Sequence, residues 1–224
     1  MAAPALLFDL DGTLVDSVYQ HVGAWHDALR SAGIALSMWR IHRKVGMSGG
    51  LFVRALAREL GRPVDAATVS DLGRRHAEAY AKRFDEVVPL PGASELLATL
   101  TDLGVPWAIA TSGGREVAYR TLALLDIPPG VPIVTRDEVA HAKPDPDLFL
   151  KAAEKLGVEI TNSIVVGDSV WDLLAARRAR ALGVGLLSGG YGLDELQIAG
   201  AYRVYDDPAD LLQHLDEVGV RAPH

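Results

Sequence analysis

The stretch ALLFDLDGT at residues 5–13 sets the architecture that the rest of the chain follows. Its first four residues are apolar, which is enough for a buried strand and too short for a helix. Asp9 and Asp11 stand where this strand ends, and in α/β proteins the carboxyl ends of strands form the crevice that binds ligands. Two neighbouring carboxylates repel each other, and hard divalent cations choose carboxylate and carbonyl oxygens. The stretch therefore indicates a metal-dependent site at the first strand.

The composition is that of a folded protein with an acidic net charge. The chain has 224 residues, of which 49% are hydrophobic, and this length suits one main domain carrying a sizeable insert. Its formal net charge of -7 argues against a general nucleic-acid binder, which needs a basic face to displace phosphate counterions. A small anionic substrate is compatible with this charge, because a local basic pocket can sit in an acidic protein.

The sequence carries no pattern for export, membrane insertion or disulfide bonding. It has no cysteine, which excludes disulfides and thiolate metal sites. Residues 1–4 lack the basic region of a signal peptide, Asp9 interrupts the first apolar run, and no stretch reaches the length of a membrane span. We therefore expect a soluble cytoplasmic protein that binds neither nucleic acid nor membranes.

The first third of the chain reads as helical. Residues from about 15 to 88 contain no convincing buried strand. Ser17 and Asp65 are suited to cap the first and last of the expected helices, and Gly33 ends the first. The helices are expected over residues 17–32, 39–45, 51–60 and 65–84. We predict that residues 17–88 form an all-helical insert.

Strands and helices alternate after Pro91-Gly92. Strands are expected over residues 105–110, 131–134, 163–166, 184–187 and 202–205. Helices are expected over residues 93–103, 115–125, 146–156, 170–182 and 207–215, and Gly183 is expected to end the fourth of them. Repeated strand–helix units imply right-handed crossovers and a parallel sheet that helices cover on both faces. The predicted fold is α/β, with a Rossmann-like three-layer core over residues 1–16 and 89–224.

Polar residues also follow two of the later strands. Thr111-Ser112-Gly113-Gly114 follows the second expected strand, and Gly167-Asp168-Ser169 follows the fourth, with Asp172 just beyond it. Lys143 lies between the third strand and the next helix. If the strands are parallel, these groups meet at the edge of the sheet where Asp9 and Asp11 lie.

Each of these signals has a structural alternative. Asp11 starts an Asp-Gly pair, which is a common turn, and Thr111 or the serine after it can cap the following helix. Asp168 can equally be a turn residue or a helix cap. Lys143 precedes a proline and by itself fits an exposed loop lysine. Their coincidence at successive strand ends is what favours a shared site.

The four groups suit one reaction. Asp9, Asp11 and Asp168 can surround one Mg2+, which prefers oxygen ligands. Thr111 and the amides after it can hold a phosphoryl group at a helix N-terminus, and Lys143 can offset the excess negative charge. One of the first two acids can be a nucleophile and the other a general acid and base. The set describes metal-assisted phosphoryl transfer.

In these residues the sequence resembles the haloacid dehalogenase (HAD) superfamily, in its phosphoglycolate phosphatase and β-phosphoglucomutase-like branch. The resemblance covers nearly the whole chain, and all four family motifs appear in order. These are Asp9-Leu10-Asp11-Gly12-Thr13, then Thr111, then Lys143, then Gly167-Asp168-Ser169 with Asp172. Four ordered motifs are far more specific than any one of them.

The resemblance implies a catalytic role for each acid. Asp9 would be the nucleophile that accepts the phosphoryl group, and Asp11 would protonate the leaving oxygen and then activate water. Asp9, the backbone carbonyl of Asp11, and Asp168 would bind Mg2+. Asp172 would hold waters of the metal or orient Lys143. A second acid at Asp11 also counts against a dehalogenase, because a leaving halide needs no proton.

The resemblance also implies how the phosphoryl group is bound. Thr111, Ser112, Gly113 and Lys143 would contact it at the end of the second strand. The Lys143–Pro144 peptide bond is expected to be cis, since X-Pro is the setting where a cis bond is energetically accessible.

The helical insert matches the cap domain of this family, which closes over the site and reads the leaving group. His21, followed by Trp25, resembles a placement near the mouth of the active site, although a partly exposed helix histidine fits equally well. Ser48 belongs to the cap loop at residues 46–49. Mutases of the branch carry an arginine after this serine, where this chain has Gly49. The basic run at residues 42–44 can meet an anionic substrate or face solvent.

The expected function is therefore that of a phosphoric monoester hydrolase. It would be a Mg2+-dependent phosphatase that acts on a small phosphorylated metabolite, of the sugar phosphate or phosphoglycolate type. The alternative is a β-phosphoglucomutase-like isomerase. We expect a monomer or a weak homodimer. A second set of basic residues, which should lie on an exposed helix face, consists of Arg177, Arg178 and Arg180.

Overall fold

The computed structural model describes residues 4–61 and 64–221. Its contacts divide the chain into two compact units, one of Met1–Asp16 with Pro89–His224 and one of Ser17–Val88. Each unit has a hydrophobic core of its own. Within the described ranges, no helix combines the length and the apolar composition needed to cross a membrane.

The first unit is built on a six-stranded sheet with the order β5-β4-β1-β6-β7-β8. Its strands are β1 (Ala5–Phe8), β4 (Trp107–Ala110), β5 (Ile133–Val134), β6 (Ser163–Gly167), β7 (Leu182–Leu186) and β8 (Ala201–Tyr205). Neighbouring strands pair in parallel. The chain runs outward from β1 through β4 and β5, and then returns to β6 on the other side of β1. This reversal of direction is where α/β sheets open their ligand crevice, at the carboxyl ends of the strands.

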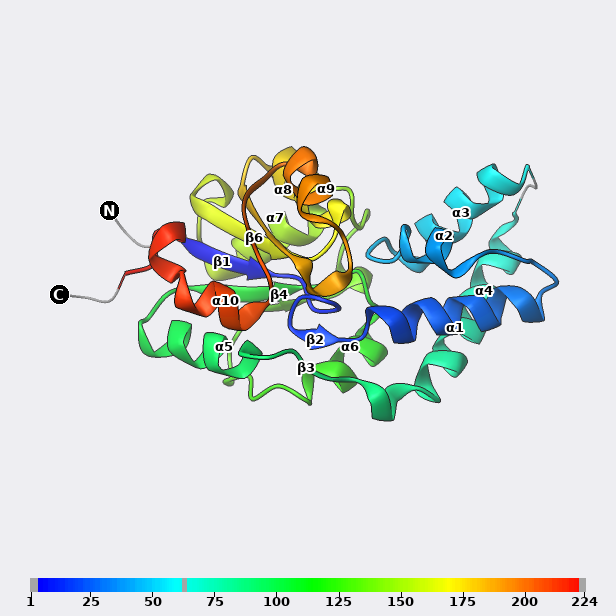
Figure 1. Ribbon diagram of the computed structural model, residues 1–224, viewed down its shortest axis with the longest axis horizontal. Coiled ribbons are helices and arrows are strands. Elements are labelled where there is room, and N and C mark those ends of the chain that lie inside the picture. Colours follow the sequence, from blue (N-terminus) through cyan, green and yellow to red (C-terminus); the bar gives the residue numbers. More distant parts are fainter. Residues whose placement is uncertain (1–3, 62–63, 222–224) are drawn as a thin grey trace. The chain divides into compact units, whose positions relative to one another are not determined.

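Helices cover both faces of this sheet. They are α5 (Ala93–Asp102), α6 (Arg115–Leu122), α7 (Asp147–Leu156), α8 (Val170–Ala179), α9 (Leu193–Ala199) and α10 (Pro208–Gln213). Leu7, Ala108 and Val165 of the strands form one core with Phe149 of α7 and Ala176 of α8. Figure 1 shows α5 and α10 on the opposite side of the strands from α7 and α8. The three layers confirm the predicted α/β class with a parallel sheet.

The second unit is helical. It contains α1 (Val18–Ser31), α2 (Met38–His42), α3 (Gly49–Leu60), α4 (Ala66–Ala81) and a 3-10 turn at Phe84–Glu86. Their core includes Val22 and Trp25 of α1, Ile41 of α2, Phe52 of α3 and Leu72 of α4, so that each of these helices contributes to it. The predicted cap residue Asp65 accepts a hydrogen bond from the backbone N–H of Thr68 at 2.8 Å.

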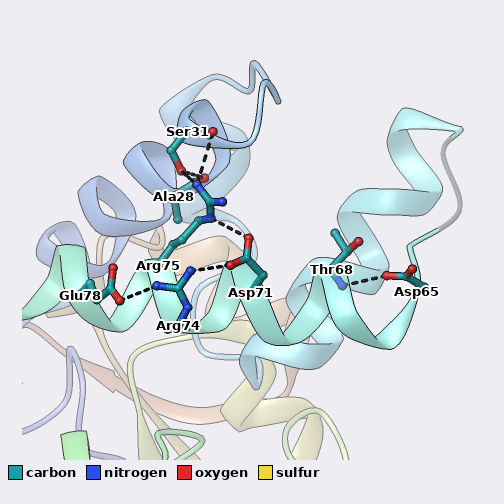
Figure 2. A network of polar contacts seen from close by, with 8 residues as sticks. All are labelled: Ala28, Ser31, Asp65, Thr68, Asp71, Arg74, Arg75 and Glu78. Carbon is teal, nitrogen blue, oxygen red and sulfur yellow. Dashed lines mark hydrogen bonds and ion pairs between the residues drawn. The ribbon is translucent and has the colours of Figure 1, made fainter.

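A network of charged side chains holds α4 to the end of α1 (Figure 2). Arg75 donates to Asp71 Oδ2 at 2.7 Å and to Ser31 Oγ at 2.9 Å. Arg74 donates to Asp71 Oδ1 and to Glu78 Oε1, both at 2.6 Å and both within α4. Arg75 therefore links two helices, whereas Arg74 supports one.

The prediction that one helix spans residues 170–182 is wrong. Helix α8 ends at Ala179, because Arg180 takes a left-handed conformation (φ 64°) and its N–H caps the last turn. Residue Leu182 already begins β7. Gly183 lies inside this strand, where a Cβ would come within 2.9 Å of Leu173 Cδ2. The glycine serves helix–sheet packing and does not end the helix.

Several short elements were not predicted. Helix α9 has seven residues between glycines, too few to show a helical period. Strands β2 (Val15–Asp16) and β3 (Val88–Pro89) have two residues each and form a separate sheet. Further 3-10 turns occur at Arg136–Glu138, Ile160–Asn162, Leu187–Gly189 and Leu215–Val218.

Candidate active site

Three predicted site residues directly follow neighbouring strands. Asp9 follows β1, Thr111 follows β4 and Asp168 follows β6. The strands are in register, because Phe8 is paired with Ile109 on one side and with Val166 on the other. The N–H of Asp9 continues the ladder to the Val166 carbonyl at 2.9 Å. The sheet therefore brings these three residues to one edge.

Lys143 is buried among the carboxylates at this edge. Its Nζ contacts Asp9 Oδ1 and lies 2.7 Å from Asp172 Oδ1. The lysine side chain is 0% exposed, and it comes from the loop before α7. Its ammonium also lies 5.4 Å from the centre of the Phe149 ring. Burial rules out the alternative of an exposed loop lysine, and the Lys143–Pro144 peptide bond is cis, as expected.

Asp172 and Asp168 have hydrogen-bond donors of their own. Asp172 Oδ2 accepts from the N–H of Ser169 at 3.2 Å and from its Oγ at 2.5 Å. With Oδ1 facing Lys143, both oxygens of Asp172 are engaged. Asp168 Oδ1 accepts from Thr13 Oγ1 at 3.1 Å. One oxygen each of Asp9, Asp168 and Asp172 lies within 4.8 Å of the others.

Burial shifts the ionisation of this cluster. Loss of hydration raises the pKa of Asp9 to about 7, against the opposing effect of Lys143 and with help from the charge of Asp172. Burial, followed by the charges of Asp172 and Asp9, raises the pKa of Asp168 well above its usual value. For Lys143, burial works against the charge, but Asp172 and Asp9 outweigh it and raise its pKa. Three carboxylates thus share one lysine, and the excess negative charge with an oxygen-only donor set fits a divalent cation such as Mg2+.

The loop after β4 brings Thr111 and Gly113 close to Asp11. Thr111 is buried, and its Oγ1 accepts from the N–H of Gly113 at 3.0 Å, which leaves the hydroxyl hydrogen to donate elsewhere. The buried Oγ of Ser112 has no hydrogen-bond partner among the described residues. A Cβ on Gly113 would lie 3.2 Å from Thr111 Oγ1 and 3.9 Å from Asp11 Oδ2. Thr111, Gly113 and the carboxylate of Asp11 therefore border the same small space.

The N-terminus of α6 is only partly open to an anion. The N–H of its first residue, Arg115, donates to Asp137 Oδ2 at 2.6 Å. Neither Thr111 nor Ser112 caps this helix, because the N-cap position is Gly114. The capping alternative for Thr111 is therefore wrong, and an anion at this place would rely on the loop itself.

Three residues that support the site were not predicted from the sequence. Thr13 binds Asp168, as described above, and Ser188 donates its hydroxyl to the Gly12 carbonyl at 2.6 Å. A Cβ on Gly189 would lie only 1.8 Å from Asp168 Oδ2, so no other residue fits there without displacing that carboxylate. Thr13 belongs to the first motif, and Ser188-Gly189-Gly190 begins two residues after the end of β7. These positions are the signal that could have indicated them.

The two candidate residues of the insert, His21 and Ser48, lie in the second unit. His21 Nδ1 is hydrogen-bonded to His76 Nε2 at 3.1 Å, and its ring stacks on Tyr80 with centroids 4.0 Å apart. Ser48 is buried at the N-cap position of α3, without a side-chain cap bond. Of the basic run, Lys44 pairs with Glu59 at 2.8 Å.

Comparison with known proteins agrees with the geometry of the first unit. A family model described as haloacid dehalogenase-like hydrolase matches residues 3–180. The chain belongs to this family. The resemblance noted in the sequence is thereby confirmed, and so is the expected class of enzyme, a hydrolase.

Relatives of this haloacid dehalogenase-like hydrolase carry phosphatase names. The chain is 35% identical over 216 residues to a phosphoglycolate phosphatase from Rhodospirillum rubrum, covering 92% of this chain and 88% of the relative. It is 33% identical over 182 residues to hexitol phosphatase A from Escherichia coli, covering 80% and 81%. A crystal structure of a hydrolase from Pseudomonas syringae superposes with a TM-score of 0.94 at 53% identity, covering 97% of this chain and 100% of the other. These names agree with the expectation of a phosphoric monoester hydrolase.

Proposed function

We propose that the protein is a Mg2+-dependent phosphatase that hydrolyses a small phosphate monoester through an aspartyl-phosphate intermediate. One observation carries this proposal: Asp9, Asp168 and Asp172 converge within 4.8 Å with a single buried lysine, Lys143. Such a cluster of strongly perturbed carboxylates at a sheet edge is typical of catalytic sites. The phosphatase names of the relatives support the same reaction.

The contacts of the individual carboxylate oxygens indicate which residues would hold the metal. Asp9 and Asp168 each have one oxygen that the described contacts leave unassigned, and the backbone carbonyl of Asp11 would complete the protein ligands. Asp172 would stay outside the ligand set, because Lys143 and Ser169 engage both of its oxygens. When bound, Mg2+ would neutralise the carboxylates and the transferring phosphoryl oxygens.

In the first chemical step, an ionised oxygen of Asp9 attacks the phosphorus atom and the bond to the ester oxygen breaks. The leaving oxygen takes a proton from Asp11, whose carboxylate lies beside the loop of Thr111. Lys143 supports the ionised form of Asp9, because its charge opposes the rise in the pKa of that carboxyl. Thr111 and Ser112 would donate to the phosphoryl oxygens, and the buried Ser112 hydroxyl would thereby gain a partner.

In the second step, Asp11 accepts a proton from water as the water oxygen attacks the phosphorus atom. The bond between phosphorus and Asp9 breaks, and inorganic phosphate leaves. The proton from water replaces the one that Asp11 gave to the leaving oxygen, so that both aspartates regain their starting state.

We assign substrate choice to the second unit. Residues 17–88 would act as the cap, with His21 and Ser48 contacting the substrate. The arginine that mutases carry at position 49 has little room, because a Cβ on Gly49 would lie 3.3 Å from Trp25 Cζ2. The Trp25 ring is itself packed between Phe52 and His76, with centroid distances of 4.3 Å to each. This packing favours a phosphatase over a phosphoryl-transfer isomerase. A soluble small-molecule substrate and a monomer or weak homodimer remain predictions.

The test is a phosphate-release screen over sugar phosphates, phosphoglycolate and nucleotides, with Mg2+ and with EDTA. We expect release that requires Mg2+ and is abolished in Asp9→Asn, while substrate binding by that variant still depends on Mg2+. Mass spectrometry of acid-quenched wild-type protein should show one added phosphoryl group, absent from the variant. Turnover by Asp9→Asn comparable to wild type would overturn the mechanism.

The same screen separates the isomerase alternative. A phosphatase converts a hexose 1-phosphate into free hexose and inorganic phosphate, whereas a mutase accumulates the hexose 6-phosphate. Predominant formation of the 6-phosphate would reject the assignment to a phosphatase and point to an isomerase that works without the arginine at position 49.

A further inference from the structure

Arg178 is more than a member of an exposed helix face. It lies on α8, half-exposed to solvent, and its Nη1 donates to the carbonyl oxygen of Pro144 at 2.8 Å. The same Nη1 lies 3.1 Å from Asp145 Oδ1. Arg178 therefore binds the two residues that directly follow Lys143, from a helix 34 residues further along the chain.

The segment that carries Lys143 needs such support. Residues 139–146 lie between the 3-10 turn Arg136–Glu138 and α7, and they form neither helix nor strand. Local side chains hold its first part: Arg136 donates to the Val139 carbonyl at 2.6 Å, and Asp147 accepts from the N–H of His141 at 3.1 Å. The part around Lys143 has one local backbone bond, from the N–H of Asp145 to the Ala142 carbonyl at 3.1 Å, and Arg178 adds a hold from a helix distant in sequence.

Helix α8 thus contacts this segment at two places. Asp172, in its first turn, faces the ammonium of Lys143 at 2.7 Å. Arg178, near its last turn, holds the main chain one residue beyond Lys143. The two contacts fix both the charged end and the backbone end of the lysine against one rigid element. With the ion pair alone, the main chain at Lys143 could still move, because the lysine side chain is long and flexible. A second contact at the backbone restricts that movement.

We propose that Arg178 is a positioning residue, which keeps Lys143 in contact with Asp9 by fastening the main chain at Pro144. The structural part of this inference concerns the order of the segment alone, and its kinetic part rests on the proposed phosphatase reaction. Catalytic groups that drift from their productive geometry lose rate steeply, even where the changed residue is distant from the chemistry. Loss of Arg178 should therefore lower kcat and leave KM nearly unchanged.

The experiment compares Arg178→Ala, Arg178→Lys and the matched control Arg177→Ala, which removes an exposed arginine of the same helix. Hydrogen exchange, followed by mass spectrometry, reads the order of a peptide over residues 139–150. A peptide over β6 serves as the internal reference. Initial rates with the best substrate of the screen, or with p-nitrophenyl phosphate, give kcat and KM.

We expect faster exchange of the 139–150 peptide in Arg178→Ala, with no change in the β6 peptide. We also expect a fall in kcat of about fivefold or more, with KM within about twofold of wild type. Arg178→Lys should restore part of both effects, since an ammonium can still donate to a carbonyl but lacks the planar fork. Arg177→Ala should behave as wild type.

The outcomes separate this inference from the proposed function. If the wild type releases no phosphate from any substrate, the proposed function fails, while the exchange experiment still tests the hold on the segment. Unchanged exchange in Arg178→Ala overturns the inference. Faster exchange with unaltered kcat also overturns it, because the contact would then be structural only.

Discussion

Asp9 in the first unit and Asp71 in the second are both carboxylates that face a cation, and burial separates them. Asp9 is 3% exposed and contacts Lys143 in the interior of its unit. The side chain of Asp71 on α4 is 41% exposed, and Arg75 and Arg74 hydrogen-bond to it (Figure 2). Loss of hydration raises the pKa of Asp9 to about 7, whereas hydrogen bonds from Arg75 and then Arg74 lower the pKa of Asp71.

The difference shows which interaction dominates in each place. In the buried cluster, the loss of hydration destabilises the ionised form of Asp9 by more than the attraction to Lys143 stabilises it, so ionisation is disfavoured. On the exposed helix, water still solvates the carboxylate, and the guanidinium donors add to that solvation. Burying charged groups costs stability, so stability does not explain why this cluster is present. We attribute it to the proposed phosphoryl-transfer reaction.

Lys143→Met should produce the largest effect on stability. The change leaves Asp9 and Asp172 as buried carboxylates without their cation, and breaking a buried pair by removing one partner costs about 3–5 kcal/mol. Urea unfolding in EDTA at about pH 8 measures the loss of unfolding free energy. Lys155→Met is the matched control, because it removes a partly exposed lysine paired with Glu138. A loss no larger than that of the control would contradict the view that burial decides.

Asp9→Asn should change how stability depends on pH in the absence of metal. The pKa of Asp9 rises from 3.8 to about 7 on folding, so the native state holds more protons between these values. Unfolding free energy therefore falls as pH rises through this window, because the stabilising contribution is complete below about pH 4 and is lost above about pH 7. Asn has no proton to lose, and the variant should show a shallower fall.

Urea unfolding of both proteins in EDTA at a series of pH values checks this. The wild type and Asp9→Asn should have similar stabilities at the acid end and diverge at the alkaline end, with the variant more stable. Parallel curves would show that Asp9 titrates normally in the folded protein. The raised pKa of Asp168 adds a fall of the same sign in both proteins, and this fall is smaller in the variant because the charge of Asp9 contributes to that raised pKa. The difference between the curves therefore reports Asp9 together with its effect on Asp168.

Much of the architecture could be predicted because its signals are local. Each of β1, β4 and β6 is a mostly apolar run followed directly by a polar residue, and the parallel sheet then brings Asp9, Thr111 and Asp168 together. The end of α8 could not be predicted in this way. A left-handed C-cap is usually glycine, and here Arg180 adopts it, while the nearby Gly183 serves packing in a strand.

The supporting residues of the site escaped prediction because their partners are distant in sequence. Thr13 binds Asp168, which is 155 residues away, and Ser188 binds the carbonyl of Gly12, 176 residues away. Arg178 looked like one of several arginines on a helix, and only the folded chain places Pro144 beside it. A polar residue after an apolar strand can be recognised from the local sequence. A hydrogen bond between two loops depends on the topology of the whole unit.

Arg75→Ala should have a smaller effect than either change at the buried site. The arginine joins α4 to α1 through Ser31, and it also binds Asp71. Thermal unfolding should show a modest decrease in Tm, of which the part due to Asp71 disappears in high salt because exposed charges are screened. Ser31→Ala removes the bond from Arg75 to Ser31 Oγ and the bond from this hydroxyl to the Ala28 carbonyl, and it keeps the ion pair of Arg75 with Asp71. Its effect on Tm should not depend on salt. A decrease as large as that of Lys143→Met would mean that exposure does not weaken this network.

Arg74→Ala should have the smallest effect of all. Its two partners, Asp71 and Glu78, lie on the same exposed helix, so its loss separates no elements. In Arg74→Ala the pKa of Asp71 should stay below its ordinary value, because Arg75 is the larger of the two causes, and it should return to that value when both arginines are replaced. NMR titration of the Asp71 carboxyl measures this directly. If Arg74→Ala lowers Tm as much as Arg75→Ala, pairs within one helix stabilise this unit as strongly as the link between two. Hydrogen bonds between helices would then contribute no more to the stability of this unit than ion pairs within one helix.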